Sequence, residues 1–171
     1  GLESAAFDLV APQGTRRVTL RLPGLYNVYN ALAAGSLGLA LDVPLDDVVA
    51  GLERFSAAFG RFERIEMDGR RLLMLLIKNP AGANEVLRTL TLEDGEHDVF
   101  AVLNDNVADG RDVSWVWDAD FEVLAGRVRR VTCSGTRAAE MALRLKYAGI
   151  DPDRIAVAGG LDDGLDRALA D

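Results

Sequence analysis

The chain has 171 residues, of which 49% are hydrophobic and 27% are charged, a composition typical of a globular protein with a substantial core. Its formal net charge of -8 and its pI of about 4.7 argue against a surface for nucleic acid or an anionic membrane, because binding phosphates requires clustered Lys and Arg. A single cysteine, Cys133, excludes an internal disulfide and a cysteine-based zinc site, and we expect no metal ligands.

The first part of the chain reads as a strand hairpin followed by a helix. Residues 7–11 and 18–22 are predicted strands on either side of a turn at 12–16, and alternation in the second strand puts its apolar residues on one face. Residues 25–42 are rich in Ala and Leu, with apolar residues three and four apart. This segment therefore predicts a largely buried helix.

A second helix and a charged linker follow. Residues 45–59 carry two aspartates in the first turn, which the helix dipole favours, and apolar residues on one side. The charged segment after them contains the pair Asp68-Gly69, which is typical of a hairpin turn. We expect a domain boundary in this linker, which divides the chain into domains of residues 1–62 and 63–171.

Beyond this boundary, strands alternate with helices. The predicted strands are 72–77, 98–103, 128–135 and 154–159, and the predicted helices are 79–90, 118–125, 136–149 and 162–171. The first of these strands, LLMLLI, is a continuous apolar run, as expected of a strand buried on both faces. Alternation at this length predicts an α/β fold with a parallel-rich sheet and right-handed crossovers.

The densest group of polar side chains directly follows the predicted strand 98–103. Nine residues contain Asn104, Asp105, Asn106, Asp109, Arg111 and Asp112, and the only two tryptophans, Trp115 and Trp117, come next. Open α/β sheets place chemistry at the carboxyl ends of their strands. An ordinary acidic turn is the alternative, because Asn, Asp and Gly are common turn formers. The tryptophans are either apolar anchors of a docking surface or core residues beside the loop.

Three further segments have both a binding and a structural interpretation. Asn27 and Asn30 lie one helical turn apart, where amides bind a nucleotide base or cap the helix. Arg61, in the linker, is either a phosphate clamp or one more linker charge. Lys78 and Asn79 directly follow a predicted strand. They are either presented for binding at the sheet edge or simply begin the next helix.

The chain contains no credible catalytic pair of its own. We expect Cys133 to be a small core residue at a strand end, and His97, the only histidine, to lie in a solvated turn. A mechanism that needs a histidine would have to take it from a partner. No apolar run approaches the ~18 residues that cross a bilayer, and no secretory signal is visible, so we expect a cytoplasmic protein.

In order along the chain, LPGLYNVYNALAA, FGRFERI and strand-KNPAG resemble the Mur ligase family. In that family an N-x-x-N helix closes the central ATP-binding domain, a G-R-x-E segment links it to a Rossmann-like C-terminal domain, and an H-N-P or K-N-P turn follows that domain's first strand. More narrowly, KNPAGANEVL, LNDNVADGRDVSWVWDADFE and SGTRAAEMALRLKYAG resemble the MurT-type subunits of lipid II isoglutaminyl synthase. The resemblance implies that residues 1–62 end the central domain and residues 63–171 form the Rossmann-like domain.

The resemblance also implies a partner and a reaction. Such subunits pair with a GatD-type glutamine amidotransferase and use ATP, Mg²⁺ and glutamine to amidate the α-carboxylate of D-glutamate in lipid II to D-isoglutamine. GatD brings a nucleophilic cysteine and a histidine, and the position that matches the acid of its triad is Asp112. The resemblance further implies nucleotide contacts for Asn27, Asn30, Arg61, Lys78 and Asn79.

Several alternatives stay open within this resemblance. Asp105 and Asp109 rival Asp112 as the acid, and Arg111 is expected to pair with one of them and keep it ionised. Asp109, Arg111 and Trp115 are the expected partner contacts. The alternative functions are a docking module without catalysis and a Mur-type ligase that adds an amino acid, for which no pocket motif is visible.

The chain also departs from the family in three places. The phosphate loop of the Mur ligases, their substrate-binding N-terminal portion and the four-cysteine zinc ribbon of MurT-type subunits are missing from the 171 residues. We therefore expect part of a longer subunit that neither hydrolyses ATP nor amidates a substrate by itself.

Overall fold

The computed structural model describes residues 3–56, 61–67, 69–92 and 94–170, with the backbone alone for Arg61. The chain forms two compact units, Gly1–Leu76 and Ile77–Asp171, and each is described by itself. The boundary predicted between residues 62 and 63 lies N-terminal of this division. As a boundary between family domains it stays a prediction.

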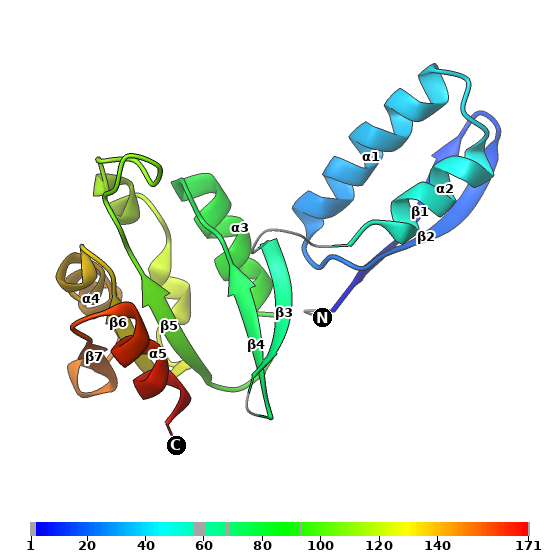
Figure 1. The fold of residues 1–171 in the computed structure, drawn as a ribbon. Helices are drawn as coiled ribbons and strands as arrows, with labels where there is room; N and C mark the ends of the chain where they lie inside the picture. The colour runs from blue at the N-terminus through cyan, green and yellow to red at the C-terminus, as the bar shows by residue number, and fades with distance from the viewer. Residues whose placement is uncertain (1–2, 57–60, 68, 93, 171) are drawn as a thin grey trace. The chain divides into compact units, whose positions relative to one another are not determined.

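The first unit begins with the predicted hairpin. Strands β1 (Ala5–Ala11) and β2 (Gly14–Leu20) pair antiparallel. Helices α1 (Leu25–Ala40) and α2 (Leu45–Arg54) pack against one face of this hairpin (Figure 1). The buried side chains that join these elements are Leu9, Val18, Leu20, Ala31, Leu45 and Val48. The alternation predicted for residues 18–22 is confirmed for Val18 and Leu20, which both lie in this core. The strand itself begins at Gly14, inside the predicted turn, and ends before Leu22.

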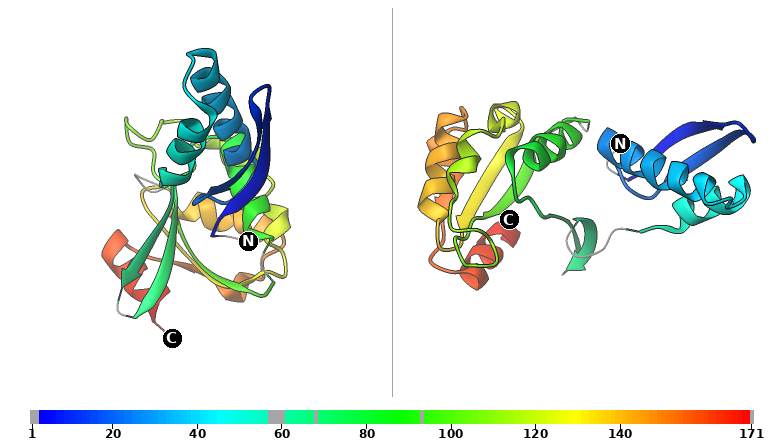
Figure 2. Two further views of the ribbon diagram at one scale, coloured as in Figure 1. Left: turned by 90° about the vertical axis from the view of Figure 1, so that its right-hand side faces the viewer. Right: turned by 90° about the horizontal axis from the view of Figure 1, so that it is seen from above.

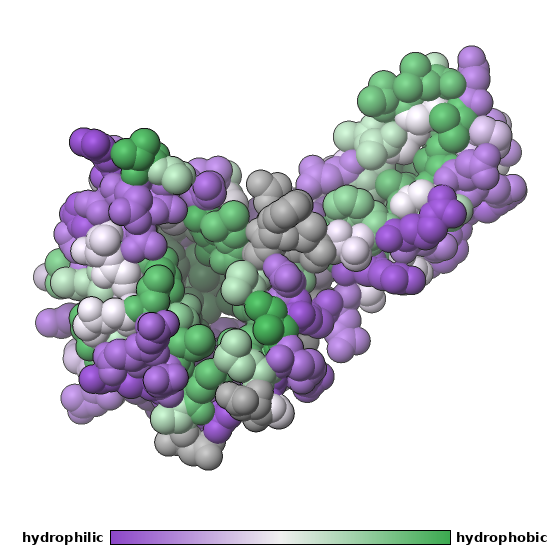
Figure 3. Space-filling model, viewed as in Figure 1, coloured by the Kyte–Doolittle hydropathy of each residue, from purple (hydrophilic) through white to green (hydrophobic). Residues whose placement is uncertain are grey.

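Both helices differ in part from the prediction. Helix α1 is not largely buried: only Asn27, Ala31 and Gly35 are buried, whereas Leu25, Tyr29 and Leu37 are exposed. Hydrophobic surface over this helix is visible in Figure 3. Helix α2 ends at Arg54, short of the predicted residue 59, because Phe55 is extended and exposed.

The apolar run 72–77 does not join the parallel sheet. Strand β4 (Arg70–Leu75) pairs antiparallel with β3 (Arg61–Met67) in a separate two-stranded sheet, and each of its side chains is half-buried or exposed. The prediction of a strand buried on both faces is therefore wrong. The reason is local, since Met67 pairs with Arg70 across a two-residue turn of the kind that an Asp-Gly pair favours. Asp68 itself lies outside the described residues.

The second unit contains a three-stranded parallel sheet in the order β5-β6-β7. Its elements are α3 (Pro80–Leu90), β5 (His97–Val102), the 3₁₀ turns η1 (Ser114–Trp117) and η2 (Phe121–Leu124), β6 (Val128–Ser134), α4 (Ala138–Tyr147), η3 (Pro152–Arg154), β7 (Ile155–Val157) and α5 (Leu161–Leu169). This confirms the predicted α/β fold class with a parallel sheet. The segment 118–125, predicted as a helix, contains only the short turn η2.

Helices α4 and α5 cover opposite faces of this sheet (Figure 2). On one face, Val131 and Cys133 join a core cluster with Leu145 of α4. On the other face, the Ser134 hydroxyl donates to the Gly160 carbonyl at 2.8 Å, just before α5 begins. The prediction that Cys133 is a small core residue is thus confirmed.

The prediction for His97 is wrong. This histidine is the first residue of β5, its side chain is half-buried, and its Nε2 has no hydrogen-bond partner among the described residues. His97 pairs with Val128 at the start of β6, whereas Cys133 lies five residues further along that strand, roughly 16 Å away at ~3.3 Å per residue. The two cannot form a Cys-His pair. None of the helices in the described ranges has the length and apolar character needed to cross a bilayer.

Candidate functional site

The acidic segment, residues 104–112, lies at the carboxyl edge of the sheet, as predicted. It follows the end of β5 and meets the turn after β6, where the Thr136 amide donates to Asn104 Oδ1 at 3.0 Å. The Thr136 hydroxyl donates to Asp105 Oδ1 at 2.7 Å. The ends of the two neighbouring strands are therefore joined by side-chain hydrogen bonds.

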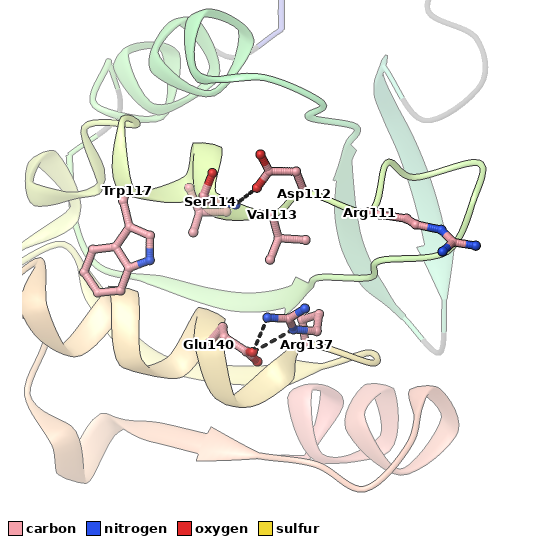
Figure 4. A pocket seen from close by; sticks show the side chains of 8 residues that line it. Arg111, Asp112, Val113, Ser114, Trp117, Arg137 and Glu140 are labelled. Carbon is pink, nitrogen blue, oxygen red and sulfur yellow. Dashed lines mark hydrogen bonds and ion pairs between the residues drawn. The ribbon is translucent and has the colours of Figure 1, made fainter.

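Arg137, and not Arg111, is the arginine that binds an aspartate of this segment. Its guanidinium lies 3.1 Å from Asp105 Oδ2, and its Nε donates to Glu140 Oε1 at 2.6 Å. The Thr136 hydroxyl, and then Arg137, hold the pKa of Asp105 below its ordinary value. Arg111 is exposed, points away from these groups in Figure 4 and forms no ion pair within the part of the chain that the structure describes. The expected pairing of Arg111 with an aspartate is wrong for the isolated chain.

Asp112 is an exposed carboxylate with a defined orientation. Its Oδ1 accepts a hydrogen bond from the Ser114 amide at 2.8 Å (Figure 4). Hydrogen bonds from the Ser114 side chain, and then from its backbone, lower the pKa of Asp112, so this carboxylate is ionised at neutral pH. A carboxylate offers about four acceptor positions, so Asp112 can still accept from a further donor.

The three candidate acids differ in how far their own chain engages them. Both oxygens of Asp105 are bound, one by the Thr136 hydroxyl and the other by Arg137. Asp109 is exposed and accepts from Asn106 Nδ2 at 3.1 Å. Asp109 and Asp112 are therefore accessible to an outside donor, and Asp105 is committed within the fold.

A cavity of about 260 Å³ opens beside Asp112. Its lining residues are Arg111, Asp112, Val113, Ser114, Val116, Trp117, Arg137 and Glu140. Asp112 stands on one side and the Arg137–Glu140 ion pair on the other, as Figure 4 shows. The pocket is lined by side chains of both charge signs and by the Trp117 ring.

The two tryptophans have different environments. Trp115 is half-buried and packs against the core cluster. Trp117 is 48% exposed, and its ring centroid lies 6.0 Å from that of the exposed Tyr147. Of the two alternatives that the sequence left open, docking surface and core, Trp117 therefore has the accessible indole that docking requires. Trp115 contributes to the core.

The predicted nucleotide contacts are only partly free to bind a ligand. Asn27 is buried, and its Nδ2 donates to the Pro23 carbonyl at 2.6 Å. Asn79 Oδ1 accepts from the Gly82 amide at 2.7 Å and caps α3, as the structural interpretation predicts. Asn30 and Lys78 are exposed.

The expected nucleotide contacts are Asn27, Asn30, Arg61, Lys78 and Asn79. The side chain of Arg61 lies outside the described residues, and the roles of all five residues stay predictions. Within the described ranges no group of three or more His, Cys, Asp or Glu side chains is placed to hold a metal ion.

Sequence reasoning missed the residues that organise the acidic segment and the two 3₁₀ turns after it. These are Ser114, Arg137, Glu140 and Arg144. A signal for two of them was present, because Arg137 lies directly before α4, three residues after the end of β6, and Arg144 lies two helical turns further on the same face.

Comparison with known proteins identifies the class to which this architecture belongs. The crystal structure of MurF from Acinetobacter baumannii superposes with a TM-score of 0.70 at 28% sequence identity, and the match covers 91% of this chain and 33% of that one. The fold is therefore that of the C-terminal part of a Mur ligase.

Within this class the chain belongs to the MurT ligase C-terminal family, whose model matches residues 76–171. It is 34% identical over 147 residues to the lipid II isoglutaminyl synthase (glutamine-hydrolyzing) subunit MurT of Streptococcus pneumoniae, a match that covers 85% of this chain and 33% of the relative. For the subunit of the same name from Staphylococcus aureus the identity is 38% over 155 residues, with 87% and 35% covered. The chain thus spans about a third of the length of these relatives.

Proposed function

We propose that this chain is the C-terminal part of the ligase subunit of a lipid II isoglutaminyl synthase, which amidates the α-carboxylate of D-glutamate with ATP and ammonia from glutamine. Its relatives are named as such subunits, and its fold is that of a Mur ligase C-terminal part. ATP and Mg²⁺ would bind to the complete subunit. Asn30 and Lys78 are the exposed candidates in this chain for contact with the nucleotide.

Within this function, the second unit docks a GatD-type glutaminase and lends Asp112 to the partner's Cys-His pair. The observation that carries this proposal is the exposed, ionised Asp112 at the carboxyl edge of the sheet, oriented by Ser114 and bordering an open cavity. An aspartate that accepts from an imidazole N–H fixes the tautomer and stabilises the imidazolium as it forms. Glutamine hydrolysis would then depend on assembly of the two subunits.

Trp117, which lines the same cavity as Asp112, forms with the exposed Tyr147 an aromatic pair that supplies apolar surface. Aromatic residues that border a polar site are common anchors of protein interfaces. The same pair also supports the alternative function, a docking module without a catalytic residue. The two functions differ only in what Asp112 does once the partner is bound.

The test is Asp112→Asn in the complete subunit, assembled with its glutaminase, with Asp109→Asn as the matched control. We expect Asp112→Asn to lower kcat for glutamine hydrolysis by roughly 10²- to 10⁴-fold, because an amide cannot hold the imidazole in the same tautomer. Asp109→Asn should change kcat by less than about threefold. The affinity for the glutaminase should hardly change in Asp112→Asn.

Two outcomes would contradict this assignment. If Asp112→Asn keeps most of its kcat, Asp112 is not the acid, and a loss in Asp109→Asn would move the role to that residue. If the rate lost in Asp112→Asn returns at high glutaminase concentration, the residue contributes only to docking.

A further inference from the structure

Two arginines, one at the N-terminal cap of helix α4 and one within it, reach toward the segment bearing Asp112. Arg137 precedes the first residue of α4 and Arg144 lies seven residues later, which is about two turns along the same helix face. Arg137 binds the start of the segment 103–124, and Arg144 binds its end. The acidic loop with Asp112 lies between these two attachments.

Arg144 is the more deeply buried of the two, with 3% of its surface exposed. Its Nε donates to the Val116 carbonyl at 3.0 Å, and a terminal nitrogen donates to the Ala119 carbonyl at 2.6 Å and to Glu122 Oε2 at 2.8 Å. Val116 lies on η1, Glu122 lies on η2, and Ala119 lies between these two turns. A single side chain therefore fixes both short turns to α4.

Two aromatic rings complete the surroundings of this guanidinium. Its central carbon lies 5.6 Å from the centre of the Trp117 ring and 5.4 Å from that of Phe121. Cation–π contacts of this kind hold a planar guanidinium against aromatic faces. Because 3₁₀ turns have poor internal hydrogen bonding, attachments from outside contribute much of the order of η1 and η2.

Arg137 fixes the other end of the segment. Its backbone amide donates to the Leu103 carbonyl at 3.0 Å, and its side chain binds Asp105. Residues 106–112 are exposed between these two attachments. Asp112 is followed by the buried Val113, whose carbonyl accepts from the Val116 amide at 3.2 Å. Movement of η1 would therefore move Asp112 with it.

We propose that Arg144 is a positioning residue, assisted by Arg137, which holds η1 against α4 so that Asp112 meets the partner's imidazole in a preset orientation. This inference rests on the proposed function of Asp112. Its physical reason is preorganisation, since a displacement of ~1 Å in a catalytic group can reduce a rate by about 10²-fold. Lysine cannot replace Arg144, because an ammonium lacks the planar fork that reaches several fixed acceptors at once.

The test compares Arg144→Met and Arg144→Lys with Asp112→Asn in the complete subunit bound to its glutaminase. We expect both Arg144 variants to lower kcat for glutamine hydrolysis by about 10- to 100-fold, with KM for glutamine and affinity for the partner changed by less than about threefold. The limb of the pH profile that reports the partner's histidine should shift to lower pH in Arg144→Met and Asp112→Asn alike. A displaced or missing carboxylate no longer stabilises the imidazolium, and this lowers the histidine pKa.

Arg154→Met is the matched control. Arg154 also binds a carboxylate, Glu96, and donates to a backbone carbonyl, that of Val128 at 2.7 Å. It lies at the amino edge of the sheet, opposite Asp112, so its loss should leave kcat and the pH profile unchanged. A merely structural role for Arg144 would lower the yield or stability of its variants without moving the pH profile.

Arg137→Met keeps the inference testable if the Arg144 variants do not fold, because the Arg137 side chain is 32% exposed and lies outside the core. We expect it to lower kcat by about 3- to 10-fold, with the same shift of the limb that reports the partner's histidine. Wild-type kcat and pH profile in the folded variants, with activity lost in Asp112→Asn, would overturn this inference and leave the proposed function intact. Full activity in Asp112→Asn would overturn both.

Discussion

Substitution of Gly135 by alanine should weaken the second unit at the point where β5 and β6 end. Gly135 has a φ of +94°, and a Cβ placed on it would lie 2.4 Å from the Leu103 carbonyl oxygen and 2.6 Å from Asn104 Oδ1. The Leu103 oxygen cannot simply move away, because it accepts the hydrogen bond from the Arg137 amide at 3.0 Å. The added methyl group therefore collides with backbone that is already held in place.

The expected loss of stability has two parts. An alanine at this positive φ costs about 1–2 kcal/mol relative to glycine. Relief of the collision by shifts of backbone and side chains costs about 1–3 kcal/mol more. With an m-value of about 1–3 kcal/mol/M, a total of about 2–5 kcal/mol lowers the urea midpoint by roughly 1–3 M.

The assay is urea unfolding of the chain followed by tryptophan fluorescence, which reports on the second unit because both tryptophans lie in it. Gly149→Ala is the matched control. Gly149 has a φ of +89°, and its added Cβ would meet only Ala125 Cβ at 3.6 Å, an ordinary contact. The free energy of unfolding of this control should fall only by the ~1–2 kcal/mol that alanine costs at a positive φ. A Gly135→Ala midpoint no lower than that of Gly149→Ala would refute the collision argument.

Two further predictions follow from the environments of Cys133 and Asp105. Burial raises the pKa of the Cys133 thiol to about 12, so the native chain should resist alkylation at pH 8 and react at once when unfolded in urea; stoichiometric labelling of the native chain would contradict this. The pKa of Asp105 is depressed in the folded state, so its stabilising contribution is complete at neutral pH and is lost as the pH falls through that depressed value. Thr136→Val removes the hydroxyl that is the main cause, and should raise the Asp105 midpoint in a carboxyl ¹³C NMR titration toward the ordinary value; an unchanged midpoint would assign the shift to Arg137 instead.

The sequence alone was sufficient for the features that depend on local periodicity. A turn at residues 12–16 followed by the alternation in residues 18–22 predicted the first hairpin, and the succession of apolar runs and amphipathic segments predicted the parallel sheet of the second unit. The position of the acidic segment followed from chain order, because a polar stretch after a parallel strand must lie at the carboxyl edge. Family motifs along the chain led to the same family as the comparisons.

The same periodicity did not decide which strand pairs with which. The run LLMLLI has the composition of a buried parallel strand, but a two-residue turn pairs it with the strand just before it. An apolar stretch indicates that a segment is extended or helical. It does not indicate which other strand the segment pairs with. Burial of α1 was overestimated for a related reason, since its apolar residues exceed the surface that the hairpin offers them.

The tertiary structure alone decided how the candidate site is organised. Its position along the chain identified Arg111 as the cation near the aspartates. In the structure, Arg137 from the neighbouring strand end binds Asp105, and Arg144 fixes η1 and η2. It also decided that Trp117 is the exposed indole. The physical reason is that periodicity along a chain reports which face of an element is buried, whereas contacts between residues 22 to 32 positions apart depend on how separate elements pack.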